Sequence, residues 1–510
     1  MEEMLRIAMI GGGATAVSLL DSLLAQETGG DVAPEIHIYE PAHLGHGVAF
    51  RDDLDCALIN LPNGRMSIRD DQRDHFLRWL RRHEGPPRPG RPEPGADGFA
   101  PRRVFGRYLR DHLAACQESA RERGWRVTVH PETVLDVARA HDGGFLVRSD
   151  GGTRACTHVV LGVGPGGPAD PYRLAGSPVF LGHPYPLKDR LAGISPGSHV
   201  LIIGTGLTAV DTVLALLAAG HRGPVTMLSR RGVLPEVLAP ARDWPLTRAD
   251  AAGIEQRKAR DGTLTRRAIW ELLHEELAAA GFDARAETGW YRPGRSAADH
   301  LRHQLTHPGA NAVQSLFLSI PTPLARAIRA ALPEEEVAAM LNDYKPRLRS
   351  LQCPMPPATA RSLLSAMDAG QLRVLAGVRE VRSARGSVTA LAGDEVVTAQ
   401  VAVDATRTTP ARAKGRQGRL VAALRRNGLA TWNAYGGLAT DPGTARLIPA
   451  RGAGPLGIFA VGELTAGDIY YASSLPAVNR GADVVAAQLL AERASRARPA
   501  RRAARQVSTP

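Results

Sequence analysis

The chain has 510 residues, of which 44% are hydrophobic and 22% charged, and its formal net charge is +12. This length and composition are typical of a globular protein with two or three domains. The sequence has no apolar run of membrane-spanning length, and its acidic start at Met1-Glu2-Glu3 is unlike a signal peptide. We therefore expect a cytoplasmic protein without a membrane partner.

The four cysteines exclude several classes of site. They are scattered, and no two have the spacing C-x-x-C: Cys56, Cys116, Cys156 and Cys353. This pattern argues against a disulfide scaffold, a zinc module and a dithiol reductase.

The positive charge is concentrated at the end of the chain. Six arginines lie in the last eighteen residues: Arg493, Arg496, Arg498, Arg501, Arg502 and Arg505. Such a run is typical of a solvated, disordered segment, and no nucleic-acid-reading module accompanies it. We predict a basic disordered tail over residues 493–510 and no nucleic-acid partner.

The first motif is an apolar strand pattern that ends in a glycine turn. Residues 5–10 lead into Gly11-Gly12-Gly13-Ala14-Thr15-Ala16, and leucines at helical spacing follow through Leu24. Glycines let the backbone approach a pyrophosphate, which the free N–H groups of the following helix can bind. The turn therefore predicts a dinucleotide site with the spacing G-x-G-x-x-A.

A second strand pattern over residues 36–39 ends in Glu40. An acid at this position is typical of a hydrogen bond to an adenosine ribose with a free 2′-hydroxyl. The alternative is an exposed acid at a strand end. Gly47, Asn60 and Gly164 lie in neighbouring glycine-rich or strand-ending segments, and we predict that they also contact the cofactor.

The segments between these motifs predict further elements of the first domain. Residues 76–80 and 108–113 have helical patterns. The alternation at Trp125, Val127 and Val129 and the run over 145–147 predict a small antiparallel sheet.

The second cofactor motif repeats strand, turn and helix. The apolar residues 200–203 lead into Gly204-Thr205-Gly206-Leu207-Thr208 and an alanine- and leucine-rich helix. The next strand pattern, 225–228, ends in Ser229-Arg230-Arg231-Gly232 instead of an acid. Hydroxyl and guanidinium groups bind a 2′-phosphate by charge-assisted hydrogen bonds, so this motif predicts NADPH. The alternative is two surface arginines.

Residues 235–340 have mostly helical periodicity. Within them, His300, His303 and His307 fall on roughly one helical face. Metal binding there is one interpretation, but histidines on a polar helix more often face solvent, and we predict no metal site.

Strand patterns return at residues 372–375, 388–390, 396–397 and 401–406, and the last of these is followed by a small-residue turn. Near the end, an apolar strand pattern runs into Gly462 and Glu463, and a loop with Tyr470 and Tyr471 precedes a helix start near Pro476. The N-terminus of that helix is suited to stabilise negative charge on a reduced flavin.

Together these patterns predict an α/β fold with two Rossmann-like dinucleotide-binding domains and a mostly helical insertion. The predicted parts are an FAD-binding domain over 1–195 and 401–492, an NADPH-binding module over 196–235 and 346–400, the helical insertion over 236–345, and the tail over 493–510.

The chain resembles a bacterial group of FAD/NAD(P)-binding flavoproteins related to the N-hydroxylating monooxygenases of ornithine and lysine. The resemblance covers roughly residues 5–235 and 340–490, and is carried by Gly11-Gly12-Gly13, residues 45–50, residues 58–62, residues 204–211, Ser229-Arg230-Arg231-Gly232 and Gly462-Glu463.

The resemblance implies that the first domain holds FAD through Gly11, Gly13 and Glu40, while the second presents NADPH. Asp404-Ala405-Thr406 looks like the D-x-x-x-[LF]-A-T-G strand end of the N-hydroxylases, with Arg407 in place of the glycine. Residues 180–183 look like the start of the F-x-G-x-x-x-H fingerprint of class B monooxygenases, with His183 too early in the motif.

The motifs supply no nucleophile, metal centre or thiol pair, so the chemistry is assigned to the cofactor and no catalytic residue is named. We predict that NADPH reduces FAD and that a flavin hydroperoxide formed with molecular oxygen oxygenates a small polar substrate, for which the resemblance implies an amine. The alternatives are a reductase or oxidase with a non-oxygen acceptor such as a quinone, and a non-catalytic flavin-binding interaction protein. The sequence does not predict an oligomeric state.

For the substrate pocket the best candidates are Asn60, Arg65, Met66, Ser67 and residues 344–349. Ordinary loop and packing positions are an equally good interpretation of these residues.

Overall fold

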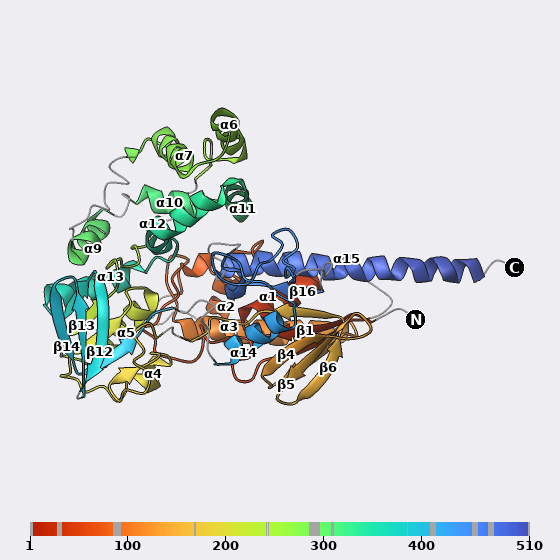
Figure 1. The fold of residues 1–510 in the computed structure, drawn as a ribbon, viewed down its shortest axis with the longest axis horizontal. Helices are drawn as coiled ribbons and strands as arrows, with labels where there is room; N and C mark the ends of the chain where they lie inside the picture. The colour runs from red at the N-terminus through yellow and green to blue at the C-terminus, as the bar shows by residue number, and fades with distance from the viewer. Residues whose placement is uncertain are drawn as a thin grey trace. The chain divides into compact units, whose positions relative to one another are not determined.

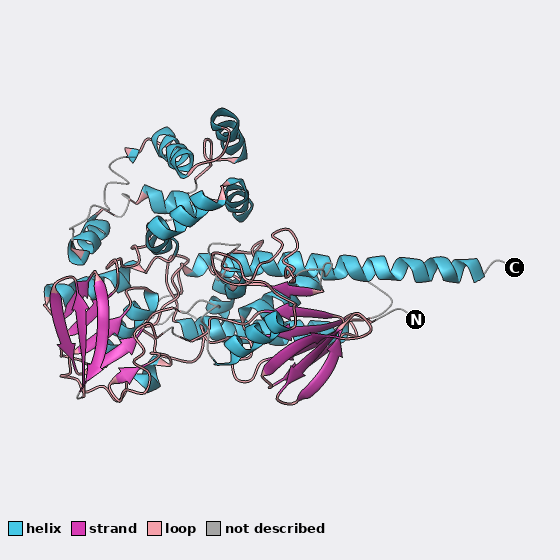
Figure 2. Ribbon diagram, in the orientation of Figure 1, coloured by secondary structure: helices cyan, strands magenta, loops and turns pink. Residues whose placement is uncertain are grey.

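The computed structural model describes residues 4–27, 33–84, 93–167, 170–240, 242, 244–284, 296–307, 311–384, 386–407, 415–450, 457–467 and 474–507. The chain forms two compact units. The first comprises residues 1–53, 62–169 and 407–510, and the second comprises 54–61 and 170–406. Each unit contains a five-stranded parallel sheet, whose strands are magenta in Figure 2.

The first sheet has the strand order β16-β7-β1-β2-β3. Its strands are β1 (Arg6–Ile10), β2 (Glu35–Tyr39), β3 (Arg126–His130), β7 (His158–Leu161) and β16 (Ile458–Ala460). The central strands are continuous apolar runs and are buried, as expected for parallel strands covered on both faces.

Helices and a small meander accompany this sheet. Helix α1 packs against α3 and α15, and the antiparallel meander β4-β5-β6 shares a core with the sheet and α14 (Figure 1). The elements are α1 (Ala14–Gln26), η1 (Asn63–Arg65), α2 (His75–Glu84), α3 (Arg102–Glu122), β4 (Val134–Arg139), β5 (Phe145–Ser149), β6 (Gly152–Cys156), α14 (Gly415–Arg426), η4 (Glu463–Thr465) and α15 (Leu475–Val507).

The second sheet has the strand order β11-β10-β9-β15-β8. One core contains residues of α5 and α13 together with this sheet, and another lies between the sheet and the antiparallel meander β12-β13-β14. The elements are β8 (Phe180–Leu181), α4 (Leu187–Arg190), β9 (Val200–Ile203), α5 (Leu207–Ala218), β10 (Val225–Leu228), α13 (Pro357–Asp368), β11 (Leu372–Leu375), β12 (Val378–Ala384), β13 (Ser387–Ala392), β14 (Glu395–Ala399) and β15 (Val401–Asp404).

Between β10 and α13 the chain forms a series of helices, drawn in green in Figure 1. They are α6 (Ala251–Asp261), α7 (Arg266–Ala279), α9 (Ala297–Thr306), α10 (Ala312–Ser319), α11 (Thr322–Ala331) and α12 (Glu334–Gln352). Several begin at a side-chain cap, such as Asp250, whose side chain accepts from Gly253 N, and Thr265, whose side chain accepts from Ala268 N.

Three features differ from the sequence expectations. Strand β3, expected in an antiparallel sheet, pairs in parallel with β2. Strands β8 and β15 were expected in the first domain, but they pair with each other, and β15 also pairs with β9 in the second sheet. The limits of the two units therefore differ from the predicted boundaries at residues 195 and 401. Helix α15 continues to Val507, where a disordered tail was expected from residue 493. Alanine and arginine, abundant there, are both strong helix formers.

Within the described part of the chain, no helix is both long and apolar enough to cross a bilayer.

Candidate cofactor sites

The first glycine turn lies at the carboxyl edge of the first sheet. Gly11 has a φ of +103°, and a Cβ atom there would lie 2.6 Å from the Gly162 carbonyl oxygen. Only glycine fits this close approach of β1 to the turn after β7. Gly13 is the N-cap of α1 and makes no side-chain capping bond. Thr15 and Ala16, in the first turn of α1, are buried.

The segment around Gly47 packs directly on this turn. The Gly45 N–H donates to the Gly12 carbonyl oxygen at 2.7 Å, and a Cβ atom at Gly13 would lie 3.2 Å from Gly47 Cα. The structure therefore brings together Gly13 and Gly47, which the sequence predicted as separate cofactor contacts.

Glu40 lies beside the same turn. Its Oε2 accepts from Gly12 N at 3.1 Å, and its Oε1 accepts from Ala42 N at 3.2 Å and His43 N at 3.0 Å. A carboxylate has about four lone-pair sites, so these bonds leave acceptor capacity for a ribose hydroxyl.

The remaining predicted contacts of the first unit follow neighbouring strands. The Gly164 carbonyl oxygen, after β7, accepts from Gln417 Nε2 at 2.7 Å. Gly462 and Glu463 follow β16, and a Cβ atom at Gly462 would lie 3.7 Å from Thr15 Oγ1. Pro476 lies in the first turn of α15, where Ala477 N donates to Ser474 Oγ at 3.3 Å. Tyr470 and Tyr471 lie outside the described residues.

The second glycine turn repeats this arrangement after β9. Gly204 has a φ of +123°, and a Cβ atom there would lie 2.9 Å from the Ala405 carbonyl oxygen. Gly206 is the N-cap of α5 without a side-chain capping bond, and a Cβ atom there would meet no described atom within 4 Å. Leu207 and Thr208 form the first turn of α5 and are half-buried.

The end of β10 joins this turn through hydroxyl groups. Thr205 Oγ1 and Ser229 Oγ are 3.0 Å apart, and Gly232 N donates to Ser229 Oγ at 2.9 Å. Arg230 and Arg231 follow and are exposed. The strand end therefore offers positive charge beside the second turn.

Asp404 is the last residue of β15, which neighbours β9, and it is fully buried. Its Oδ2 accepts from Asp170 N at 3.1 Å, and its Oδ1 accepts from Thr406 N at 2.9 Å. Burial raises the pKa of this carboxyl group above its usual value, because it outweighs the hydrogen bonds from Thr406 and Asp170, which lower it. These bonds hold the turn after β15 beside Gly204.

The other predicted residues are divided between the units. Asn60 belongs to the second unit, whereas Met66 and Ser67 belong to the first and are buried, in favour of a packing role. Arg65 is the last residue of η1 and is half-buried. Residues 344–349 lie in α12, where the side chain of Tyr344 is outside the described residues. His183 Nδ1 accepts from Tyr185 N at 3.1 Å.

The histidines of α9 have different surroundings. His300 Nε2 is 3.1 Å from Oε2 of the buried Glu236, so the expectation that it faces solvent is wrong. His303 and His307 stack with ring centroids 4.4 Å apart, and His307 is exposed.

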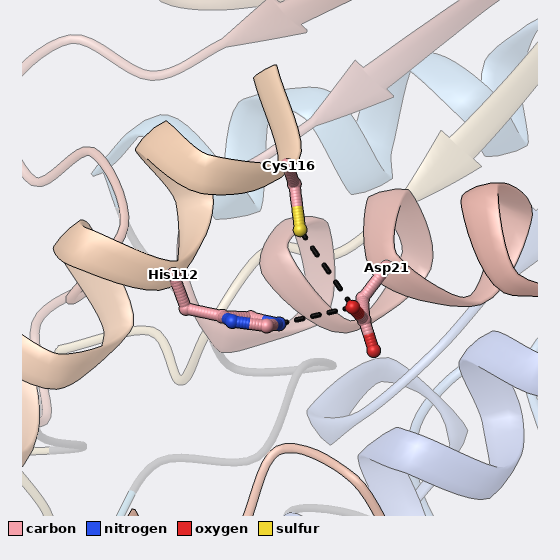
Figure 3. Close-up of side chains that lie close together, drawn as sticks. All are labelled: Asp21, His112 and Cys116. Atoms are coloured by element: carbon pink, nitrogen blue, oxygen red, sulfur yellow. Dashed lines mark hydrogen bonds and ion pairs between the residues drawn. The ribbon is translucent and has the colours of Figure 1, made fainter. Parts of the chain in front are cut away.

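A buried polar cluster in the first unit was missed by sequence reasoning (Figure 3). Asp21 on α1 lies beside His112 and Cys116 on α3, with Asp21 Oδ1 3.0 Å from His112 Nε2 and 3.7 Å from Cys116 Sγ. These residue types can bind a metal. However, Arg69 also donates to Asp21, from Nη2 at 2.5 Å and from Nε at 2.9 Å.

Electrostatics favours an ion pair over a metal ion in this cluster. A cation bound to Asp21 Oδ1 would lie next to the guanidinium group of Arg69. Burial raises the pKa of the Cys116 thiol to about 12, which opposes the thiolate that a metal requires. Burial also opposes ionisation of Asp21, but its bonds with His112 and Arg69 bring its pKa well below the usual value.

The two turns fit dinucleotides on three observations. Each turn lies at the carboxyl edge of a parallel sheet. Each precedes a helix whose N-cap is a glycine, so no side chain occupies the N–H groups at the start of the helix. Each also contains a glycine where the backbone approaches a neighbouring strand end too closely for any Cβ atom. Such an edge is where dinucleotide phosphates bind in doubly wound folds.

Comparison with known proteins agrees with this fit. Residues 8–166 match a family model described as FAD-NAD(P)-binding, so this part of the chain is an FAD/NAD(P)-binding domain. A relative, the uncharacterized protein YdhS of Escherichia coli (strain K12), is 24% identical over 308 residues. The match covers 55% of this chain and 56% of that protein, so the chain spans about half the length of this curated relative.

Two solved structures share the fold. The ornithine N-hydroxylase KtzI of Kutzneria sp. 744 has a TM-score of 0.54 at 13% identity, with 96% of this chain and 100% of that chain covered. The L-lysine 6-monooxygenase of Pseudomonas syringae has a TM-score of 0.53 at 15% identity, with 95% and 98% covered. The chain therefore has the α/β fold of flavoproteins with two dinucleotide-binding domains, as the sequence predicted.

Proposed function

We propose that this chain is an oxidoreductase in which NADPH reduces bound FAD, and that it is a monooxygenase of a small polar substrate. The observation that carries the proposal is the pair of glycine turns. Each lies at the carboxyl edge of its own parallel sheet and leads into a helix that has no side-chain capping bond at its N-terminus. Bound FAD would supply electron transfer and reaction with molecular oxygen, which the side chains of this protein do not provide.

In the first unit, we assign FAD to the turn Gly11-Gly12-Gly13-Ala14-Thr15-Ala16. The N–H groups at the start of α1 would bind the pyrophosphate, and Glu40 would accept from the adenosine ribose. Gly47, Gly164, Gly462 and Glu463 would line the same edge, and the N-terminal turn of α15 at Pro476 would orient positive partial charge toward the cofactor.

In the second unit, we assign NADPH to the turn from Gly204 to Thr208. The start of α5 would bind its pyrophosphate, and Arg230 and Arg231 would bind the 2′-phosphate. Asn60 belongs to the same unit, and its contact with a cofactor also stays a prediction.

An amine is the substrate class that we propose first. The motif resemblance and the fold shared with an ornithine N-hydroxylase and an L-lysine 6-monooxygenase support this choice. The chain departs from the N-hydroxylase motif at Arg407, so the assay must include other amines.

The test is a turnover assay of the purified flavin-loaded protein. NADPH oxidation, oxygen uptake, peroxide and oxygenated product are measured over diamines, amino acids and aromatic amines. Product formed in proportion to NADPH supports a monooxygenase. NADPH oxidation that depends on an added quinone and proceeds in the absence of oxygen would identify a reductase. Failure of NADPH to bleach the flavin would contradict both activities.

A further inference from the structure

A buried ion pair lies at the carboxyl edge of the first sheet. Arg407 Nε donates to Glu463 Oε1 at 3.1 Å, and Arg407 Nη2 also contacts Glu463 Oε2. The side chain of Glu463 is 5% exposed and that of Arg407 is 32% exposed. The two residues are 56 positions apart in the sequence, so the pair forms only in the folded chain.

The position of Glu463 connects the pair to the first glycine turn. Gly462 follows β16, and Val461 N donates to the Leu161 carbonyl oxygen at 3.0 Å, which holds this segment against the end of β7. A Cβ atom at Gly462 would lie 3.7 Å from Thr15 Oγ1, in the first turn of α1. Glu463 thus lies at the same sheet edge as the turn to which we assign the pyrophosphate.

A carboxylate at this position has an electrostatic cost for a dinucleotide. The pyrophosphate is negative, and repulsion between like charges is stronger in a buried site than in water. A buried carboxylate without a partner also loses its hydration. A guanidinium group with two contacts to Glu463 compensates both effects.

We propose that Arg407 is a positioning residue that compensates the charge of Glu463 and thereby permits tight binding of an anionic dinucleotide at this edge. The proposal rests on the assignment of FAD to the first unit. It states that Arg407 acts through Glu463 and not by a contact of its own with the cofactor.

The test measures FAD affinity without NADPH or substrate, by titration of flavin-depleted protein with FAD. We expect R407M to raise the dissociation constant at least tenfold, because it leaves a buried unpaired carboxylate. E463Q removes that charge and gives the reference constant for a site without the carboxylate. The double variant R407M/E463Q should bind FAD within threefold of E463Q.

The decisive comparison is between E463Q and the double variant, and it stands even where R407M alone does not fold. A difference of tenfold or more would mean that Arg407 contacts the cofactor directly, and would overturn the proposal. An R407M constant within threefold of the parent would also overturn it. If the parent binds no FAD, the proposed function itself fails, so the two failures are distinguishable.

A matched control lies at the other end of α1. Arg493 Nη1 pairs with Glu27 Oε2 at 2.8 Å, with the side chain of Glu27 8% exposed, and Glu27 is the C-cap of α1. R493M breaks a comparably buried pair far along the helix from the glycine turn. It should leave FAD affinity within threefold of the parent.

Discussion

The two glycine turns have the same backbone arrangement and differ at the end of the next strand. In the first unit the strand ends in an acid, and Glu40 accepts from Gly12 N. In the second unit it ends in Ser229, which bonds Thr205 and Gly232 and is followed by the exposed Arg230 and Arg231. The backbone of the two turns is thus alike, while the residues at the end of the next strand determine the charge that each turn presents.

The helices that follow the turns differ in a similar way. Each carries a buried acid, Asp21 in α1 and Asp211 in α5. Asp21 pairs with the charged Arg69, whereas Asp211 accepts from the neutral hydroxyl of Tyr185. Arg69 thus gives the buried acid of α1 an ionic partner, and Tyr185 gives the buried acid of α5 a hydroxyl donor.

The largest effect is expected from a bulky residue in the first turn. Gly13→Val would place its side chain against Gly47, since even a Cβ atom would lie 3.2 Å from Gly47 Cα. We expect flavin-free protein, measured as the ratio of flavin absorbance to protein.

The control for Gly13→Val is Gly206→Val in the second turn, where a Cβ atom meets no described atom within 4 Å. It should keep the flavin and weaken NADPH binding. Flavin retained in Gly13→Val would contradict the assignment of FAD to the first turn.

The next effect concerns the two buried acids. Arg69→Met removes the guanidinium partner of Asp21, and breaking a buried pair costs about 3–5 kcal/mol of unfolding free energy. Tyr185→Phe removes one hydrogen bond to Asp211, at a cost of about 1–3 kcal/mol. Denaturant unfolding followed by circular dichroism measures both.

Arg121→Met is the control for these variants. Its pair with Glu118 is exposed, with side chains 73% and 55% accessible, so unfolding should be unchanged. If Arg69→Met were no more destabilising than Tyr185→Phe, the ion pair of Asp21 would contribute no more to stability than the hydrogen bond from Tyr185.

The local parts of this comparison could be predicted from sequence, because they depend on short-range patterns. An apolar run followed by glycines and a leucine-rich stretch predicted both turns, at Gly11 and Gly204. The first turn lies between β1 and α1, and the second lies between β9 and α5. Glu40 and Ser229 were found because each lies at the end of the next strand.

Long-range arrangements could not be predicted in the same way. β15 and β7 have equivalent apolar patterns, and only pairing with β9 assigns β15 to the second sheet. Asp21 and His112 meet only because α1 and α3 pack together, and Arg69 reaches Asp21 from the segment between η1 and α2; no periodic signal connects the three residues. Arg407 and Glu463 are likewise distant in sequence.

A smaller effect should separate the two strand ends. Arg230→Glu/Arg231→Glu reverses the charge beside the second turn, and bonds to charged groups contribute about 1.5–3 kcal/mol. We expect the NADPH dissociation constant to rise about 10- to 100-fold. NADH binding should change much less, as measured by fluorescence titration.

Glu40→Gln is the matched variant in the first unit. It should weaken FAD binding and leave the ratio of NADPH to NADH affinity unchanged. A changed ratio in Glu40→Gln, or an unchanged ratio in the arginine variant, would contradict the division of cofactors between the turns.

The smallest effect is a pH dependence of the first unit. His75 Nδ1 lies 2.8 Å from Tyr108 Oη, and burial lowers the pKa of His75 to about 4, assisted by the charges of His112, Arg69 and Arg78 and opposed by Asp21. A histidine in the unfolded chain has a pKa of about 6.5. Between about pH 4 and 6.5 the unfolded state therefore binds more protons than the folded state. Stability should therefore fall on acidification through this window.

With allowance for solvent screening of a half-buried ring, the loss attributable to His75 between about pH 7 and 5 is about 1 kcal/mol. His75→Gln keeps a polar partner for Tyr108 and removes the titration, so its unfolding free energy should depend less on pH across this range. Denaturant midpoints at several pH values measure the difference. If the unfolding free energy of His75→Gln kept the parent's pH dependence, other groups of the first unit would carry the acid sensitivity. Asp21 is not one of them in this range, because its pKa lies well below its usual value and it would contribute only below about pH 4.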